Sequence, residues 1–158
     1  MNILFLDVDG VLNSDEYYNY IRPVRKNLKF PDSKIDPDAV NLLNYIVAKT
    51  DCEIVVSSAW RYGKTLDALV RLFHEMGIEK DIFDMTKWDV NTLKGVTPRG
   101  DEIQGWLDEN KEIVTKYAIL DDSYAMSDEQ LPYTVFTDDK VGLTEENAEE
   151  IIRILNSK

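Results

Sequence analysis

Short apolar runs alternate along the chain with longer segments whose apolar residues recur every three to four positions. The first pattern is typical of buried strands and occupies residues 2–8, 52–58, 81–85, 117–122 and 133–137. The second is typical of helices packed on one side and occupies residues 36–50, 65–77, 97–110 and 143–158. This alternation predicts one α/β domain over residues 1–158, a Rossmann-like three-layer α/β/α sandwich around a central, mostly parallel sheet.

Polar residues mark the start of each predicted helix. The expected caps, whose side chains accept hydrogen bonds from free backbone N–H groups, are Asp36, Thr65, Thr97 and Thr144. Pro37 and Pro98 follow two of these caps and suit the first helical position. Residues 14–35 show no clear period, so we predict a long loop there, or a minimal cap over a site.

Composition and charge narrow the class of protein. A chain of 158 residues, 44% of them apolar, can build one domain core. No apolar run approaches the ~20 residues of a membrane span. The formal charge of −12 disfavours a nucleic-acid coat or an anionic membrane surface as partner. Basic residues nevertheless gather in one segment, where Asp32 is the single acid: Arg22, Arg25, Lys26, Lys29 and Lys34.

The single cysteine, Cys52, cannot form an internal disulfide. The first residues also lack the basic start and the cleavage site of a secretion signal. We therefore expect a cytoplasmic protein. His74, the one histidine, lies in a helical stripe without a cysteine partner, which disfavours a zinc site.

Chemically active residues follow three of the predicted strands. Because ligands of parallel sheets bind beyond the carboxyl ends of the strands, these residues are expected to converge there. Four carboxylates at one edge need a compensating cation, and oxygen ligands suit Mg²⁺. Arg99, in the first turn of a predicted helix, adds a cation that can face an anion. The candidate residues are Asp7, Asp9, Gly10, Ser57, Ser58, Arg61, Arg99, Asp121 and Asp122.

The order of these motifs resembles the haloacid dehalogenase (HAD) superfamily over nearly the whole chain. The motifs are DVDGV, VVSS at a strand end, a cation at a helix start, and ILDD. Four longer stretches are similar to the small HAD domains grouped with Swiss Army Knife RNA-repair proteins: FLDVDGVLN, SSAWR, PRGDEIQGWL and GLTEENA.

The resemblance implies a role for each motif residue. Asp7 would be the nucleophile, and Asp9 would protonate the leaving oxygen, help to activate water and offer its backbone carbonyl to Mg²⁺. Either Ser57 or Ser58 would hydrogen-bond the phosphoryl group. Asp122 would bind the metal directly, with Asp121 assisting. The substrate contacts would come from Gly10, the serine, Arg61 and Arg99.

Two motifs depart from the common family pattern. Many relatives carry a lysine in the third motif, where this chain offers Arg99 most naturally and Lys87 or Lys94 as alternatives. An arginine can still clamp a phosphate with two hydrogen bonds. In the fourth motif, Asp121 takes the position of a common glycine, and Met126 lies where a later acid is often found.

The resemblance therefore implies a Mg²⁺-dependent phosphomonoester hydrolase that works through an aspartyl-phosphate. The segment 14–35 is too short for a separate cap domain, so the site should be open. The resemblance implies that an open site accepts large substrates. We expect a phosphorylated partner, either a nucleotide or a nucleic-acid end, and no membrane partner. Two alternatives remain: a receiver-like signalling module with a phosphorylated aspartate, and a catalytically silent binding domain of the same fold.

Overall fold

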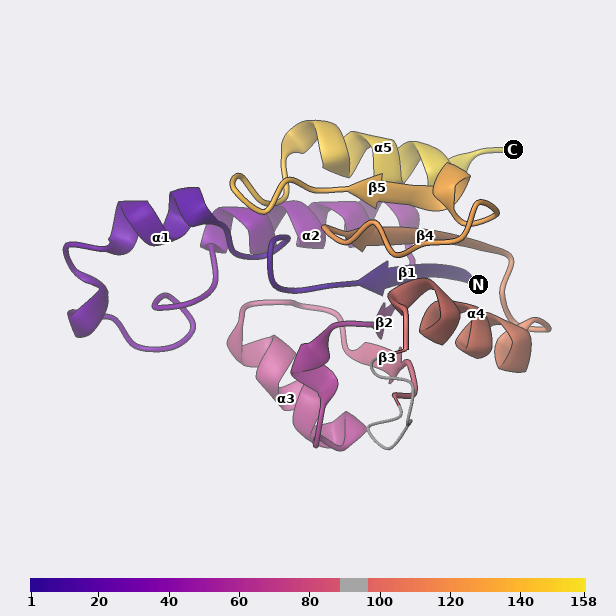
Figure 1. Ribbon diagram of the computed structural model, residues 1–158, viewed down its shortest axis with the longest axis horizontal. Helices are drawn as coiled ribbons and strands as arrows, with labels where there is room; N and C mark the ends of the chain where they lie inside the picture. Colours follow the sequence, from indigo (N-terminus) through magenta and orange to yellow (C-terminus); the bar gives the residue numbers. More distant parts are fainter. Residues whose placement is uncertain (89–96) are drawn as a thin grey trace.

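The computed structural model describes residues 1–88 and 97–158 of the chain. Five strands form one parallel sheet in the order β3-β2-β1-β4-β5 (Figure 1). The strands are β1 (Asn2–Leu6), β2 (Glu53–Val56), β3 (Ile82–Met85), β4 (Lys116–Asp121) and β5 (Thr134–Phe136). The helices are α1 (Asp15–Ile21), α2 (Pro37–Thr50), α3 (Leu66–Glu75), α4 (Arg99–Asn110) and α5 (Glu145–Asn156). Three short 3₁₀ turns complete the set: η1 (Arg25–Asn27), η2 (Ala59–Arg61) and η3 (Leu131–Tyr133).

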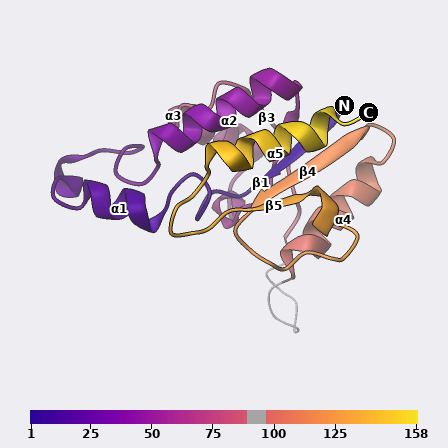
Figure 2. The same ribbon diagram turned by 90° about the horizontal axis from the view of Figure 1, so that it is seen from above.

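Helices cover both faces of the sheet, so the predicted α/β/α sandwich is confirmed. Figure 2 shows α2, α3 and α5 on one side of the strands and α4 on the other. Alternate residues of β1 serve the two layers. Leu4 and Leu6 belong to the larger core beneath α2, α3 and α5, whereas Ile3 and Phe5 belong to a smaller core beneath α4. A strand buried on both faces explains the unbroken apolar run that starts the sequence.

One aromatic side chain anchors α4 to the sheet. The Trp106 ring packs edge-on against Phe5, with ring centroids 5.4 Å apart and an interplanar angle of 82°. Its indole N–H donates a 2.7 Å hydrogen bond to a carboxylate oxygen of Asp84 at the end of β3. These contacts hold the helix so that its first residue, Arg99, lies at the carboxyl edge of the sheet.

Most of the predicted helix starts are confirmed. The side chains of Asp36, Thr65 and Thr144 each accept a hydrogen bond from the first turn of their helices. The start of α4 differs by one residue, because Pro98 is the N-cap and Thr97 lies outside the helix. The extended backbone of Pro98, with ψ of 142°, places Arg99 at the first helical position.

Residues 14–35 are not the continuous loop that the sequence predicted. The Ser14 hydroxyl caps α1 by accepting a hydrogen bond from the backbone N–H of Tyr17. Tyr17 and Ile21, four residues apart on one helix face, are buried. A single pair of apolar residues four positions apart is too short a pattern to reveal a helical period in the sequence. In both views, α1 lies beyond the carboxyl ends of the strands (Figures 1 and 2).

The strand order places a change of direction at β1. From β1 the chain proceeds outward to β2 and β3, and it then returns to lay β4 on the other side of β1. In parallel α/β sheets the crevice at such a switch point is the usual ligand site. In the described parts of the chain, no helix has both the length and the apolar content needed to cross a membrane.

Candidate active site

Three polar side chains lie side by side where the central strands end. The backbone N–H of Ser57 donates to the carbonyl of Leu6, and that of Asp7 donates to the carbonyl of Leu120, at 3.1 and 3.0 Å. The parallel register therefore continues one residue past the strands and aligns Ser57, Asp7 and Asp121 in a row across β2, β1 and β4. Aligned residues of parallel strands point to the same face.

The face in question is the one beneath α4. Two residues before each member of the row stand Val55, Phe5 and Ile119, and all three belong to the smaller core that α4 covers. Because side chains alternate along a strand, the Ser57, Asp7 and Asp121 side chains also face α4. We call Ser57, Asp7 and Asp121 the strand-end row.

A carboxylate cluster forms around this row. Asp7, Asp121 and Asp122 each present one carboxylate oxygen, and these atoms lie within 4.8 Å of one another. The Asp121 side chain is fully buried and Asp7 is 5% exposed. Three negative charges at this spacing repel one another strongly when water is excluded, so the cluster needs positive charge nearby.

Arg99 supplies part of that charge. One of its guanidinium nitrogens lies 2.7 Å from a carboxylate oxygen of Asp121 and 3.3 Å from one of Asp7. Lys87, an alternative for this role, is exposed and pairs instead with Glu109 at 2.7 Å. Lys94 lies outside the described residues. With all three acids ionised, Arg99 leaves two negative charges uncompensated, which matches one divalent cation.

Burial raises the pKa of two of these acids. The pKa of Asp121 rises to about 7, first through loss of hydration and then through the charge of Asp7, while Arg99 opposes the rise. The pKa of Asp122 rises to about 6 through loss of hydration, a hydrogen bond with Asp7 and the charge of Asp7. A bound cation would favour the ionised form of these carboxyl groups, and carboxylate oxygens suit a hard divalent ion such as Mg²⁺.

Gly10 allows Asp122 to approach the first motif. Its φ is +76°, and a Cβ added there would lie 2.2 Å from a carboxylate oxygen of Asp122. Its carbonyl accepts a 2.7 Å hydrogen bond from the Thr137 hydroxyl, which ties the turn to the residue after β5. The structure gives Gly10 a spacing role beside the carboxylate cluster, and its contact with substrate stays a prediction.

Asp9 stands apart from the carboxylate cluster. Its side chain is exposed, and one carboxylate oxygen accepts a 2.9 Å hydrogen bond from the Asn13 amide. The amide oxygen of Asn13 in turn accepts from the backbone N–H of Gly10, also at 2.9 Å. Sequence reasoning missed Asn13, although a polar residue four positions after Asp9 was a usable signal. The metal contact through the Asp9 backbone carbonyl stays a prediction.

The structure distinguishes the two adjacent serines. The Ser58 hydroxyl accepts a 3.2 Å hydrogen bond from the backbone N–H of Trp60 and so caps η2. The Ser57 hydroxyl is buried on the α4 face, without a hydrogen-bond partner among the described residues. Thr86, aligned with Ser57 by a hydrogen bond from its N–H to the Val56 carbonyl, has a similarly unpartnered hydroxyl. Sequence reasoning missed Thr86.

Arg61 differs most from its predicted place. We expected it to contact substrate, but its side chain is fully buried. Its guanidinium donates at 2.7–2.9 Å to three backbone carbonyls, those of Ser57, Ser58 and Thr86. It also pairs with the Glu102 carboxylate. Arg61 therefore supports the strand end that carries Ser57, behind the site.

Glu102 connects this buried arginine to the carboxylate cluster. Its carboxylate pairs with Arg61 and lies 4.0 Å from Arg99, three residues earlier on α4. An ion-pair chain therefore runs from Arg61 through Glu102 and Arg99 to Asp7 and Asp121. The acid three residues after Arg99 was visible in the sequence, but its buried arginine partner was not.

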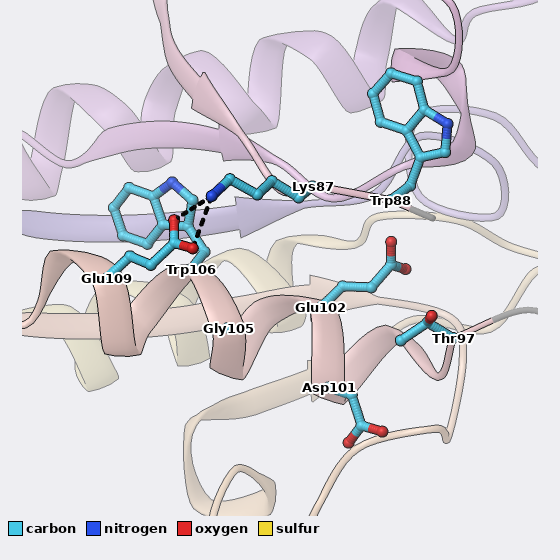
Figure 3. Close-up of a pocket in the computed structure, with 8 residues that line it drawn as sticks. All are labelled: Lys87, Trp88, Thr97, Asp101, Glu102, Gly105, Trp106 and Glu109. Atoms are coloured by element: carbon cyan, nitrogen blue, oxygen red, sulfur yellow. Dashed lines mark hydrogen bonds and ion pairs between the residues drawn. The ribbon is translucent and has the colours of Figure 1, made fainter. Parts of the chain in front are cut away.

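A hollow of about 390 Å³ opens along the other part of α4. Figure 3 shows Lys87 directed at Glu109, away from Thr97 and Asp101. Of the residues in the ion-pair chain, Glu102 alone lines this hollow. The hollow is therefore separate from the carboxylate cluster.

The raised pKa values predict how metal-free stability depends on pH. Between about pH 4 and pH 7 the folded protein holds protons on Asp121 and Asp122 that the unfolded chain releases. These bound protons stabilise the folded state at low pH. The stabilisation is lost as the pH rises through the pKa values that Asp121 and Asp122 have in the folded protein. Asp122→Asn should therefore melt above the parent at pH 8 in EDTA, and the difference should shrink at pH 5.

Thermal melts followed by circular dichroism measure this effect, with Asp108→Asn on the exposed face of α4 as control. Added Mg²⁺ at pH 8 should make the parent melt above Asp122→Asn, because only the parent keeps all three carboxylates that would bind the ion. A variant that melts below the parent at pH 8 in EDTA would contradict the predicted repulsion.

A second prediction separates the Gly10 contact from its backbone strain. Gly10 and Gly63 both have positive φ, at +76° and +71°, but a Cβ on Gly63 meets nothing within 4 Å. Alanine at either position should cost about 1 kcal/mol of stability through strain. Gly10→Ala alone should also lose the Mg²⁺-dependent rise in melting temperature. Equal Mg²⁺ responses of the two variants would show that the contact with Asp122 is not needed.

Comparison with known proteins agrees with this geometry. A family model described as the HAD domain in Swiss Army Knife RNA repair proteins matches residues 3–148. The match includes the whole strand-end row, Asp122 and Arg99. A search of curated proteins and a search of solved structures found no match. The chain belongs to the family of HAD domains found in Swiss Army Knife RNA repair proteins.

Proposed function

We propose that this domain is a Mg²⁺-dependent phosphatase that hydrolyses phosphate monoesters through a phosphorylated Asp7. The observation that carries the proposal is the strand-end row. It places the Asp7 carboxylate between the Ser57 hydroxyl, which has no hydrogen-bond partner among the described residues, and Asp121, which pairs with Arg99. Family membership supports phosphatase-type chemistry. Phosphoryl transfer requires mainly positioning and charge neutralisation, which such a row provides.

The reaction is divided between two aspartates of different exposure. A carboxylate oxygen of Asp7 forms the bond to phosphorus as the bond from phosphorus to the ester oxygen breaks. Asp9, exposed and tethered by Asn13, gives a proton to the departing oxygen. Asp9 then takes a proton from the water that attacks phosphorus, which frees Asp7 and releases inorganic phosphate.

Positive and neutral donors of the chain hold the phosphoryl group. The Ser57 hydroxyl is free to donate a hydrogen bond to a phosphoryl oxygen, because it has no partner among the described residues. Arg99 contacts Asp7 and so lies beside the oxygen that receives the phosphoryl group. Asp7, Asp121 and Asp122 would hold the metal ion. When bound, the ion neutralises charge that develops on the phosphoryl oxygens.

The segment around α1 supports a nucleotide or a nucleic-acid end as the substrate. The Arg25 guanidinium lies 5.0 Å from the centre of the Tyr18 ring. Burial raises the pKa of the Tyr18 phenol, and the negative charge of Asp9 raises it further, so this segment reaches the neighbourhood of Asp9. Cations and aromatic rings are the groups that bind nucleic-acid phosphates and bases.

Replacement of the nucleophile tests the reaction. Asp7→Asn should lower kcat at least roughly 10³-fold, because the amide cannot attack phosphorus. Phosphate release is measured with Mg²⁺ and with EDTA, on nucleotides and on oligonucleotides phosphorylated at the 3′ or 5′ end. Asp108→Asn is the matched control. Full activity of Asp7→Asn, or turnover in EDTA, would contradict the mechanism. A parent chain that keeps a stable phosphate on Asp7 would instead favour a receiver-like module.

Glu102 should act as a positioning residue through Arg99. Glu102→Gln keeps the shape but removes the charge that holds Arg61 and Arg99, so kcat should fall about 10- to 100-fold. The control is Glu109→Gln, which breaks an exposed pair on the same helix. Circular dichroism confirms that each variant is folded at the assay temperature. A kcat for Glu102→Gln equal to that of the control would exclude this role.

A further inference from the structure

A stacked pair of aromatic rings lies open to solvent next to the carboxylate cluster. The Tyr124 side chain is 79% exposed. Its ring stacks on Phe136 with the centroids 4.7 Å apart and an interplanar angle of 28°. Because Phe136 covers one face of the tyrosine ring, the high exposure of Tyr124 means that the other face is free. A free aromatic face is a surface on which another planar ring can stack.

The register of the sheet places this pair beside the reacting groups. Phe136 is the β5 partner of Asp121 on β4, and neighbouring strands lie about 4.8 Å apart. Its side chain therefore points to the same face as Asp121 and extends the strand-end row by one strand. Tyr124 follows the metal-ligand candidate Asp122 by two residues. The rings stand next to the carboxylates, on the side opposite Ser57.

Hydrogen bonds hold the segment that carries Tyr124. The backbone N–H of Ser123 donates to the Asp121 carboxylate at 2.9 Å, and that of Gly100 donates to the Ala125 carbonyl at 2.8 Å. A Cβ on Gly100 would lie 2.8 Å from that same carbonyl oxygen, so α4 packs closely against this segment. Since Tyr124 is already placed, stacking a ligand on it would order little additional chain.

We infer that Tyr124 binds a planar ring carried by the leaving group and that it gives the site a preference for nucleotides over phosphate esters without a base. The inference rests on the proposed function and names the substrate class of that site. The phosphate would lie at Asp7, Ser57 and Arg99. The ring would lie on the β5 side, against the neutral outer face of Tyr124, where base stacking needs no particular base sequence.

Two substrates that differ by one base test this inference. Adenosine 5′-monophosphate and ribose 5-phosphate share the ester and the sugar, and adenosine 3′-monophosphate tests the other end of the sugar. The variants are Tyr124→Ala and Tyr124→Phe. The control is Tyr45→Ala, since Tyr45 is 41% exposed on α2, in the helix layer on the opposite face of the sheet from α4.

We expect Tyr124→Ala to lower kcat/KM for a nucleotide about 10-fold, mainly through KM, and to leave ribose 5-phosphate within about twofold. Tyr124→Phe should keep the parent preference, and Tyr45→Ala should leave kcat/KM for both substrates unchanged. Equal losses for nucleotide and ribose phosphate, or no loss for either, would overturn the inference.

Binding separates failure of this inference from failure of the proposed function. Calorimetric titration of each variant with nucleotide and Mg²⁺ measures stacking without turnover. If no substrate is hydrolysed but Tyr124→Ala still weakens nucleotide binding about 10-fold, the stacking surface is supported and the phosphatase proposal fails. If parent and Tyr124→Ala bind nucleotide equally, the inference fails whether or not the protein hydrolyses it.

Discussion

Repulsion among three crowded carboxylates, two of them buried, is the constraint on which the rest of this structure depends. Asp7, Asp121 and Asp122 present oxygens within 4.8 Å of one another, and a single guanidinium lies against two of them. Such a cluster opposes folding unless positive charge compensates it, and its carboxylate oxygens are of the kind that bind a hard divalent cation. The surrounding residues accommodate these charges: Gly10 leaves space for Asp122, and Glu102 lies between Arg61 and Arg99.

The parallel sheet sets the spacing of these side chains. Strands in register deliver one side chain each to a common line, so Ser57, Asp7 and Asp121 become neighbours although they are far apart in the sequence. The return of the chain to β4 on the other side of β1 opens the space in which that line is accessible. The helix α4 lies on the face of the sheet toward which the Asp7 side chain points, because Trp106 packs against Phe5 on that face.

The sequence was sufficient to predict the sandwich, three of the helix caps and the convergence of the two acidic motifs, since each rests on local pattern or on strand order. It could not distinguish Ser57 from Ser58, because a shift of one residue reverses the face of a strand and the register appears only when strands pair. It also misplaced Arg61, whose partners are backbone carbonyls and Glu102, 41 residues away. The helix α1 was missed because its one buried pair, Tyr17 and Ile21, is too short to set a period.

A crystal structure of the protein with Mg²⁺ and beryllofluoride, which mimics a phosphorylated aspartate, tests whether Asp7 accepts a phosphoryl group beside a bound metal ion. We expect beryllium bonded to a carboxylate oxygen of Asp7, a fluorine accepting a hydrogen bond from the Ser57 hydroxyl, and Mg²⁺ bound by Asp7 and Asp122. Beryllofluoride bound elsewhere, or Mg²⁺ held by other residues, would contradict this expectation.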